Sequence, residues 1–233
     1  MSTRLKKLNA AREALKLVKP GMTLGVGSGS TVKVFIDELA RKFTHRDLKV
    51  VAASLDSEIH LLLRGFNPLP LYSVDEIDLA IDGADEVDPA GNLIKGGGAA
   101  LTREKIIDYY SREYVIIVDD SKLVEKLCTS HPIPVEVIPI AWRQVKKRIE
   151  KKLGGKIVLR EAVKKNGPII TDNGNIILDY YPSDTPPLKP TELETLLNNV
   201  PGVIENGVFA IKKPSKIIVG YAERVEVKSI PSL

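Results

Sequence analysis

The sequence predicts an α/β protein with a mostly parallel sheet and a second, smaller α+β domain. Two observations lead to this fold class. Over residues 1–130, apolar runs typical of buried strands alternate with segments of helical periodicity, an order that indicates βαβ units. From about residue 131, a strand, a helix, a hairpin pattern and another helix follow one another, which is typical of an antiparallel sheet.

The elements of the first part follow from apolar spacing and from the residues that end each segment. A helix over 3–18 ends at Pro20-Gly21, because proline and glycine disfavour a continuing helix. A helix over 31–43 has apolar residues at helical spacing, whereas 77–82 (IDLAID) has the short apolar run of a strand. The other elements expected here are strands over 22–27, 49–54, 69–73 and 114–119 and helices over 56–64 and 100–112.

The second part begins with a proline-flanked strand over 132–139 and a basic helix over 141–153. A strand over 156–161 precedes the segment 168–181, in which Asn173-Gly174 predicts a hairpin turn. A helix over 191–200 follows, with Thr191 as N-cap and Glu194 completing a capping box. Strand-like runs at 208–212 and 216–221 end the pattern.

Domain boundaries follow from this change of pattern. We assign residues 1–130, together with about 207–233, to the larger domain. Residues 131–206 then form the smaller domain, which we expect to contribute to oligomerisation. No internal repeat divides the chain further.

Composition excludes several classes of protein. Of the 233 residues, 43% are hydrophobic and 27% charged, as in ordinary globular domains and unlike disordered chains. No apolar stretch is long enough to span a membrane, and the first 18 residues lack the apolar core of a signal peptide. A lone cysteine, Cys128, permits no internal disulfide framework, and we expect it to fill space in the core. The sequence therefore predicts a cytoplasmic protein.

The net charge of +4 is too dispersed to indicate nucleic-acid binding. The densest basic run, Arg143–Lys152, has helical spacing, and a solvated helix face explains it better than a nucleic-acid patch. A modest basic excess also suits an anionic small substrate.

A glycine-serine loop joins the first predicted strand to a helix. The segment Gly25–Thr31 reads GVGSGST, and glycines there allow positive φ and close approach of the backbone. Amides at a helix start favour an anion, so Ser28, Gly29, Ser30 and Thr31 are candidate phosphate ligands. Neither the dinucleotide pattern G-x-G-x-x-G nor the Walker pattern is met, and a capped tight turn is the alternative.

A second polar segment, Ile77–Lys105, contains three candidate acids and a glycine triplet. Asp82 ends an apolar strand, Gly83 and Ala84 follow, and Asp85 comes next. Ligands bind at the carboxyl ends of parallel strands. Further along are Lys95, Gly96, Gly97 and Gly98, and then Glu104 early in the next helix.

Several functions are compatible with this segment. The spacing of a calcium loop is absent, but Asp82, Asp85 and Asp88 could bind magnesium, and a glycosidase carboxylate pair is also possible. A third possibility is general acid–base catalysis on a phosphorylated substrate, in which Lys95 and the glycine amides stabilise negative charge. The last alternative is an acidic surface loop with a flexible glycine tail.

Long motifs across the chain resemble those of ribose-5-phosphate isomerases of the A type. They are GVGSGSTV (25–32), DGADEVD (82–88), KGGGAALTREKI (95–106) and VDDSK (118–122), with further collinear segments at 54–62, 132–139, 171–179 and 201–210. The resemblance implies interconversion of D-ribose 5-phosphate and D-ribulose 5-phosphate in the pentose phosphate pathway, with no metal and no cofactor. It also implies a Rossmann-like domain, a smaller ferredoxin-like domain and a homodimer or homotetramer.

The resemblance also implies roles for individual residues. Glu104 matches the catalytic base of the family, and Asp82 and Lys95 match further catalytic positions. The loop Ser28–Thr31 and Lys122 match positions that contact the substrate. Many members have threonine where this chain has Ser28, and serine keeps the hydroxyl.

The expected chemistry follows from the substrate. Asp82, aided by Asp85, would move the proton that opens the furanose ring. Glu104 would take the C2 proton, which is acidic because it lies α to the C1 aldehyde, and Lys95 would stabilise the cis-enediolate. Two other functions remain open: a non-catalytic sensor of sugar phosphates, and a coenzyme A transferase with a nucleophilic glutamate.

Overall fold

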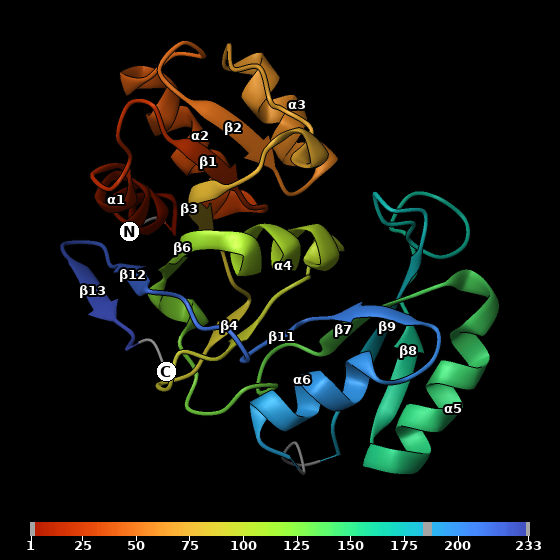
Figure 1. Ribbon diagram of the computed structural model, residues 1–233. Coiled ribbons are helices and arrows are strands. Elements are labelled where there is room, and N and C mark those ends of the chain that lie inside the picture. Colours follow the sequence, from red (N-terminus) through yellow and green to blue (C-terminus); the bar gives the residue numbers. More distant parts are fainter. Residues whose placement is uncertain (1–2, 184–187, 232–233) are drawn as a thin grey trace. The chain divides into compact units, whose positions relative to one another are not determined.

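The chain divides into two compact units. The computed structural model describes residues 3–183 and 188–231 (Figure 1). The larger unit comprises Met1–Ala84, Arg103–Leu123 and Lys213–Leu233, and the smaller unit comprises Asp85–Thr102 and Val124–Lys212.

These units do not coincide with the domain boundaries expected from the sequence. Residues 85–102, expected in the larger domain, belong to the smaller unit, because they supply β4 (Glu86–Val87) and β5 (Leu93–Ile94), which pair with β11 (Val208–Phe209). Residues 124–130 join the same unit, where Leu127 packs into its core. The last part of the chain is divided between the units, since residues up to Lys212 belong to the smaller unit and those from Lys213 belong to the larger one.

A six-stranded sheet forms the centre of the larger unit (Figure 1). Its order is β13-β12-β6-β3-β1-β2, and every neighbouring pair is parallel except β12 with the edge strand β13. The strands are β1 (Thr23–Val26), β2 (Lys49–Ala52), β3 (Ile77–Asp82), β6 (Ser111–Asp119), β12 (Lys216–Gly220) and β13 (Val225–Ser229). This confirms the mostly parallel, Rossmann-like sheet.

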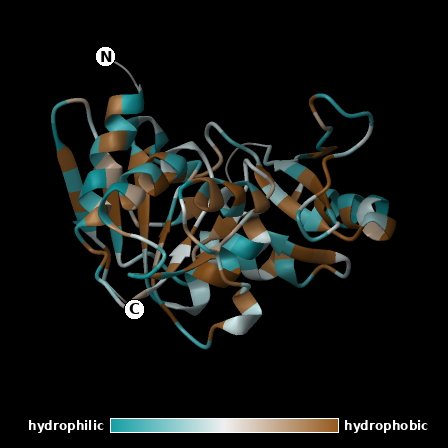
Figure 2. Cartoon of the chain, turned by 90° about the horizontal axis from the view of Figure 1, so that it is seen from above, coloured by the Kyte–Doolittle hydropathy of each residue, from teal (hydrophilic) through white to brown (hydrophobic). Residues whose placement is uncertain are grey.

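Helices α1 (Thr3–Leu15), α2 (Ser30–Lys42), α3 (Leu55–Leu63) and α4 (Leu101–Tyr110) accompany this sheet. The apolar stripe of α2, including Phe35, Ile36 and Leu39, is fully buried in a core shared with Leu24 and Ile81 of the strands. Strands in Figure 2 are accordingly mostly brown, the colour of hydrophobic residues.

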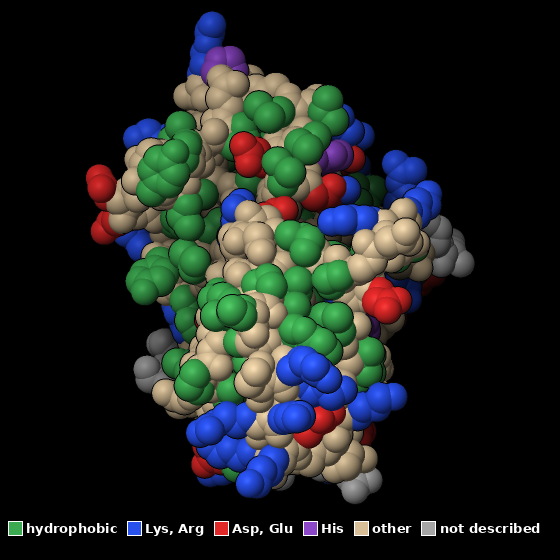
Figure 3. Space-filling view, turned by 90° about the vertical axis from the view of Figure 1, so that its right-hand side faces the viewer, with side chains coloured by type: hydrophobic (Ala, Val, Ile, Leu, Met, Phe, Trp, Pro, Cys, Tyr) green, Lys and Arg blue, Asp and Glu red, His purple; other side chains and the backbone are tan. Residues whose placement is uncertain are grey.

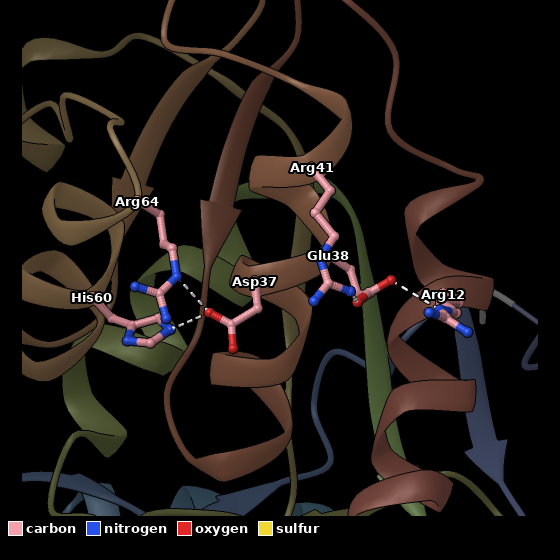
Figure 4. Close-up of polar contacts among 6 residues, drawn as sticks. All are labelled: Arg12, Asp37, Glu38, Arg41, His60 and Arg64. Carbon is pink, nitrogen blue, oxygen red and sulfur yellow. Dashed lines mark hydrogen bonds and ion pairs between the residues drawn. The ribbon is translucent and has the colours of Figure 1, made fainter.

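Two carboxylates of α2 tie this helix to its neighbours (Figure 4). Asp37 Oδ1 accepts hydrogen bonds from Arg64 Nε at 2.7 Å and His60 Nε2 at 2.9 Å. Glu38 pairs with Arg12 of α1, at 2.9 Å between Nε and Oε2, and with Arg41. Burial opposes ionisation of Asp37, but the bonds from Arg64 and His60 outweigh it and lower the pKa of this carboxyl.

The smaller unit has the strand order of a ferredoxin-like fold. Its four-stranded antiparallel sheet has the order β10-β7-β9-β8, with α5 between β7 and β8 and α6 between β9 and β10. The elements are β7 (Ile133–Val137), α5 (Trp142–Leu153), β8 (Lys156–Leu159), β9 (Ile176–Tyr181), α6 (Pro190–Asn198) and β10 (Val203–Asn206). The predicted smaller α+β domain is thus confirmed as a fold.

The basic run forms one face of α5. Val145, Ile149 and Leu153 are buried at spacings of four residues, whereas Lys147 and Lys151 are exposed. Figure 3 shows Lys and Arg side chains gathered in the lower part of that view. The prediction of an amphipathic helix at this position is confirmed.

Some predicted elements were wrong in detail. Residues 71–73 form a short 3-10 helix instead of a strand. In the hairpin region, Thr171 and Gly174 form the expected turn, but its first arm makes only isolated bridges. Helix α6 begins at Pro190, with Lys189 as N-cap and Glu192 bonded to the Lys189 amide, so the predicted capping box was wrong.

Among the residues that the structure describes, no helix is long and apolar enough to cross a membrane.

Candidate active site

The strand order of the larger unit identifies a topological switch point. Strands β2 and β3 lie on opposite sides of β1, so the connections after β1 and β3 leave the sheet in different directions. Ligands of such sheets bind at the carboxyl ends of the strands at this point. Here β1 leads into the glycine-serine loop, and β3 ends at Asp82.

Asp82 is a fully buried carboxylate fixed by backbone amides. Its side chain is 0% exposed, and its Oδ1 accepts from Ser28 N at 3.0 Å and from Gly83 N at 2.6 Å. A Cβ on Gly27 would lie 1.8 Å from the same oxygen. Glycine at position 27 is therefore required by the carboxylate of the next strand, a relation that the sequence pattern did not reveal.

The glycine-serine loop places a hydroxyl and helix amides beside Asp82. Gly29 is the N-cap of α2 and has a φ of +98°, which favours glycine. The Ser28 hydroxyl is buried and has no hydrogen-bond partner within residues 3–183 and 188–231. Lys7 of α1 donates to Ser30 Oγ at 2.8 Å. The first turn of α2, which contains Thr31, adds backbone amides that favour an anion.

Glu104 and Lys122 belong to the same unit. Glu104 lies in the first turn of α4 and is 5% exposed. Because β3 and β6 are parallel, α4 runs back along them, and its start lies toward the carboxyl ends of the strands. Lys122 ends the 3-10 turn that follows β6, and it is half-buried. Both residues thus lie on the side of the sheet where β1 and β3 end.

Asp85 and the glycine triplet are joined by a hydrogen bond within the smaller unit. Asp85 Oδ2 accepts from Gly97 N at 2.7 Å, and a Cβ on Gly97 would lie 2.9 Å from Asp85 Oδ1. Gly96 has a φ of +98°, and Gly97 and Gly98 are exposed. Arg160 donates to the carbonyl oxygens of Gly96 at 2.9 Å and Gly97 at 3.0 Å.

Lys95 is buried immediately before this triplet, with 2% of its surface exposed. Its backbone amide donates to Gly207 O at 2.9 Å, and its ammonium lies 5.3 Å from the centroid of the Phe209 ring. A lysine is rarely buried to this extent without a specific purpose.

The carboxylate of Asp88 stabilises the turn that follows it. It accepts from Ala90 N, Asn92 N and Asn92 Nδ2 at 2.7–2.9 Å. These bonds occupy the carboxylate that the magnesium alternative required. Among the described residues, no group of three or more His, Cys, Asp or Glu is arranged to hold a metal ion.

Cys128 lies in the smaller unit beside its hydrophobic core. Burial, with a smaller contribution from the charge of Glu86, raises the pKa of its thiol to about 12. It also lines a cavity of about 190 Å³ with Ile94, Leu193 and Val208. Asp88 also lines this cavity, whereas none of the residues predicted for catalysis or substrate binding does.

Two functional candidates were missed by sequence reasoning. Arg160 contacts the glycine triplet, and Glu136 contacts Thr102 in the first turn of α4. Both are charged residues in strand-like apolar runs. Such a residue needs buried partners, and that requirement was the available signal.

The fold and the switch point define a doubly wound α/β protein of the kind that binds a small ligand at the strand ends. Comparison with known proteins gives the particular family. The family model described as Ribose 5-phosphate isomerase A (phosphoriboisomerase A) matches residues 49–224, and this chain belongs to that family.

Individual relatives agree over nearly the full chain. Ribose-5-phosphate isomerase A of Methanocaldococcus jannaschii is 45% identical over 229 residues, which are 97% of this chain and 98% of that protein. The solved structure of ribose 5-phosphate isomerase A from the same organism has a TM-score of 0.91 and 41% identity, covering 98% of this chain and 100% of that one. A solved D-ribose-5-phosphate isomerase in complex with phospho-erythronic acid has a TM-score of 0.92 and 42% identity, with the same coverage.

Proposed function

We propose that this protein interconverts D-ribose 5-phosphate and D-ribulose 5-phosphate through a cis-enediolate. The observation that carries the proposal is its membership of the ribose 5-phosphate isomerase A family. A related isomerase has been solved with phospho-erythronic acid, a phosphorylated sugar acid. The reaction belongs to the non-oxidative branch of the pentose phosphate pathway.

Ring opening is assigned to Asp82, aided by Asp85. The substrate is mostly a closed furanose, and a carboxylate must carry the proton of the anomeric hydroxyl to the ring oxygen. Asp82 Oδ1 accepts hydrogen bonds from two backbone amides, which fix the position of the carboxylate. Asp85 is held by the Gly97 amide.

Proton transfer between C2 and C1 is assigned to Glu104. The C2 proton is acidic once the C1 aldehyde is free, and a carboxylate base removes it and returns it to C1. The buried position of Glu104 supports this role. A related chemical strategy is the glutamate base of triosephosphate isomerase, which acts on a different fold.

Stabilisation of the enediolate is assigned to Lys95 and to the amides of Gly96, Gly97 and Gly98. A buried ammonium acts in a low dielectric, where its effect on a developing oxyanion is large. The exposed Gly97 and Gly98 leave the backbone open to a ligand.

Phosphate binding is assigned to the loop Ser28–Thr31 and Lys122, with Gly83 and Ala84 beside the sugar. The buried Ser28 hydroxyl lacks a partner among the described residues, and a ligand oxygen would supply one. The ammonium of Lys7 contacts Ser30 Oγ, and on this basis we add Lys7 to the proposed phosphate ligands.

The decisive experiment is proton exchange in D2O. EDTA-treated protein is incubated with ribose 5-phosphate, and the sugar is followed by NMR. Formation of ribulose 5-phosphate carrying solvent deuterium supports an enediolate route that needs no metal. Direct return of the proton from C2 to C1 would lower the amount of label.

Folded protein that binds the sugar phosphate without converting it would contradict the proposal and favour the sensor. A glutamyl thioester detected by mass spectrometry after incubation with an acyl coenzyme A would favour the transferase.

We further propose a cytoplasmic homodimer or homotetramer whose smaller unit contributes to the oligomer, and which binds neither nucleic acid nor membranes. Light scattering of the purified protein measures the number of subunits. A monomer would contradict this part of the proposal and leave the isomerase activity to be judged separately.

A further inference from the structure

Glu136, the fourth of the five residues of β7, is a buried carboxylate that accepts from an unusual number of donors. Its side chain is 0% exposed. Oε1 accepts from Thr171 Oγ1 at 2.8 Å, Asn175 Nδ2 at 2.8 Å and Asn173 Nδ2 at 3.1 Å. Oε2 accepts from Thr102 Oγ1 at 2.5 Å. A buried charge is tolerated only with such compensation.

The two oxygens of Glu136 connect different parts of the chain. The donors to Oε1 all belong to the turn 171–175, whose amides at 173 and 175 also bond to Thr171 Oγ1. The donor to Oε2 is Thr102, in the first turn of α4. Glu104 follows Thr102 by two residues in the same helix. One carboxylate thus binds both the turn 171–175 and Thr102, which ends the segment 85–102 of the same smaller unit.

Arg160 makes a second set of contacts, to the glycine triplet that lies shortly before Thr102 in the chain. Its guanidinium pairs with Asp179 of β9, which leaves NH1 to donate to the carbonyl oxygens of Gly96 and Gly97. Three consecutive glycines have no side chains that could fix their conformation. The backbone at this position is therefore held by two side chains, Asp85, which accepts from Gly97 N, and Arg160, which is itself held in an ion pair.

We propose that Glu136 and Arg160 are positioning residues for the isomerisation. Between them they hold segment 96–102, which directly follows Lys95 and ends two residues before Glu104, so that both groups keep their places during the reaction. They act through this segment and exchange no proton with the sugar. The proposal rests on the proposed function, and it adds residues to which no role was given above.

The magnitude follows from the sensitivity of proton transfer to geometry. A displacement of about 1 Å at the reacting groups lowers a rate by about 10²-fold. Loss of one of these two sets of contacts, with the other kept, should therefore lower kcat by about 10- to 100-fold. Because neither residue is assigned to the phosphate site, KM should change by less than about threefold.

The test compares Thr102→Val, Thr102→Ser and Arg160→Lys with the wild type. Valine matches threonine in shape and removes only the hydroxyl donor to Glu136, whereas serine restores that donor. Lysine keeps the charge opposite Asp179 but lacks the planar fork that reaches the glycine carbonyls as well. We expect kcat to fall in Thr102→Val and Arg160→Lys and to recover to within threefold of the wild type in Thr102→Ser.

Glu150→Ala is the matched control. Glu150 Oε1 accepts from Ile157 N at 2.9 Å, so this variant loses a carboxylate hydrogen bond within the same unit that does not involve segment 96–102. It should lower the melting temperature and leave kcat unchanged. Amide hydrogen exchange, measured on all variants without substrate, should accelerate over residues 96–104 in Thr102→Val and stay at the wild-type rate there in Glu150→Ala.

Two results would overturn the inference. The first is a kcat within twofold of the wild type in both Thr102→Val and Arg160→Lys. The second is a loss of kcat in Glu150→Ala as large as in those two variants, which would show that general loss of stability explains the lower kcat. An inactive wild type would contradict the proposed function itself, and it is recognised separately because the wild type is assayed first.

Discussion

Glu104 carries the sharpest prediction at the scale of a residue. Glu104→Gln keeps the size of the side chain but cannot accept a proton, so kcat should fall by about 10²–10⁴-fold while substrate binding is retained. Steady-state kinetics and calorimetric binding measure the two effects. Glu113→Gln, an exposed glutamate on β6, is the control. A kcat within twofold of the wild type in Glu104→Gln would remove this residue from the mechanism.

Gly27 is predicted to be irreplaceable because of Asp82. In Gly27→Ala the added methyl would lie 1.8 Å from Asp82 Oδ1, so the carboxylate must move. We expect a loss of stability of about 1–3 kcal/mol and a fall in kcat of about 10²-fold. Gly167 has a φ of +95° and open space around it. The control variant Gly167→Ala should therefore lower stability and leave kcat unchanged. Urea unfolding and kinetics distinguish the two variants, and equal kcat values would contradict the argument.

Cys128 is predicted to be chemically inert in the folded protein. With a thiol pKa of about 12, the thiolate fraction at pH 8 is roughly 10⁻⁴, and only the thiolate reacts. Labelling by a chromogenic disulfide reagent should therefore be slow in buffer and fast in guanidinium chloride. Native labelling at the rate of a free cysteine would show that the thiol is accessible and ionised.

At the scale of elements, Asp37 makes the contact between α2 and α3 dependent on pH. The pKa of aspartate in an unfolded chain is about 3.9, and that of folded Asp37 is lower. The folded state therefore holds the proton less tightly, and the stabilisation, complete above about pH 4, is lost as the pH falls through the folded pKa. Asp37→Asn should be less stable than the wild type at pH 6, and the difference should shrink in acid.

Urea unfolding between pH 6 and pH 2.5 measures this difference. Arg64→Met, which removes one donor to Asp37, should lose part of the same stabilisation at pH 6. A difference between wild type and Asp37→Asn that stays constant with pH would show that the carboxyl contributes no pH-dependent stability.

The elements with strong periodicity were the ones that the sequence could predict. Helix α2 and strand β3 have buried stripes and turn signals at their ends, and both were expected within two residues. Strands β4 and β5 have only two residues each, too few for a periodic pattern. Strand β13 is mostly exposed, so its sequence has no apolar run by which a strand could be predicted.

The position of Asp82 at the end of a buried strand was predictable because polar residues follow an apolar run there, and its role stays a prediction. Lys95 and Glu104 were singled out in the segment 77–105, motif resemblance then supported their roles, and these roles stay predictions. Glu136 and Arg160 were missed because their partners, Thr102 and the Gly96 carbonyl, lie 34 and 64 residues away in sequence. A pattern within one segment cannot show such pairs.

At the scale of the whole chain, both ends meet in the larger unit. Helix α1 comes from the start of the chain, and β12 from near its end. Asn9 Nδ2 donates to Tyr221 O at 2.8 Å. A Cβ on Gly220 would lie 1.9 Å from Lys6 O, so the backbone of α1 lies directly against the end of β12. Sequence reasoning assigned this last parallel strand to the larger domain but not to a neighbour in the sheet, because strand pairing between distant segments is not visible in a local pattern.

This contact predicts that a change near the end of the chain affects the proposed phosphate site near its start. Gly220→Ala must displace α1, which carries Lys7 to Ser30. We expect the free energy of unfolding to fall by about 1–3 kcal/mol, and the KM for ribose 5-phosphate to rise with little change in kcat. Lys216→Ala, at the start of the same strand, is the control and should leave KM unchanged. A rise in KM in both variants would assign the effect to the strand, whereas no rise in Gly220→Ala would separate α1 from phosphate binding.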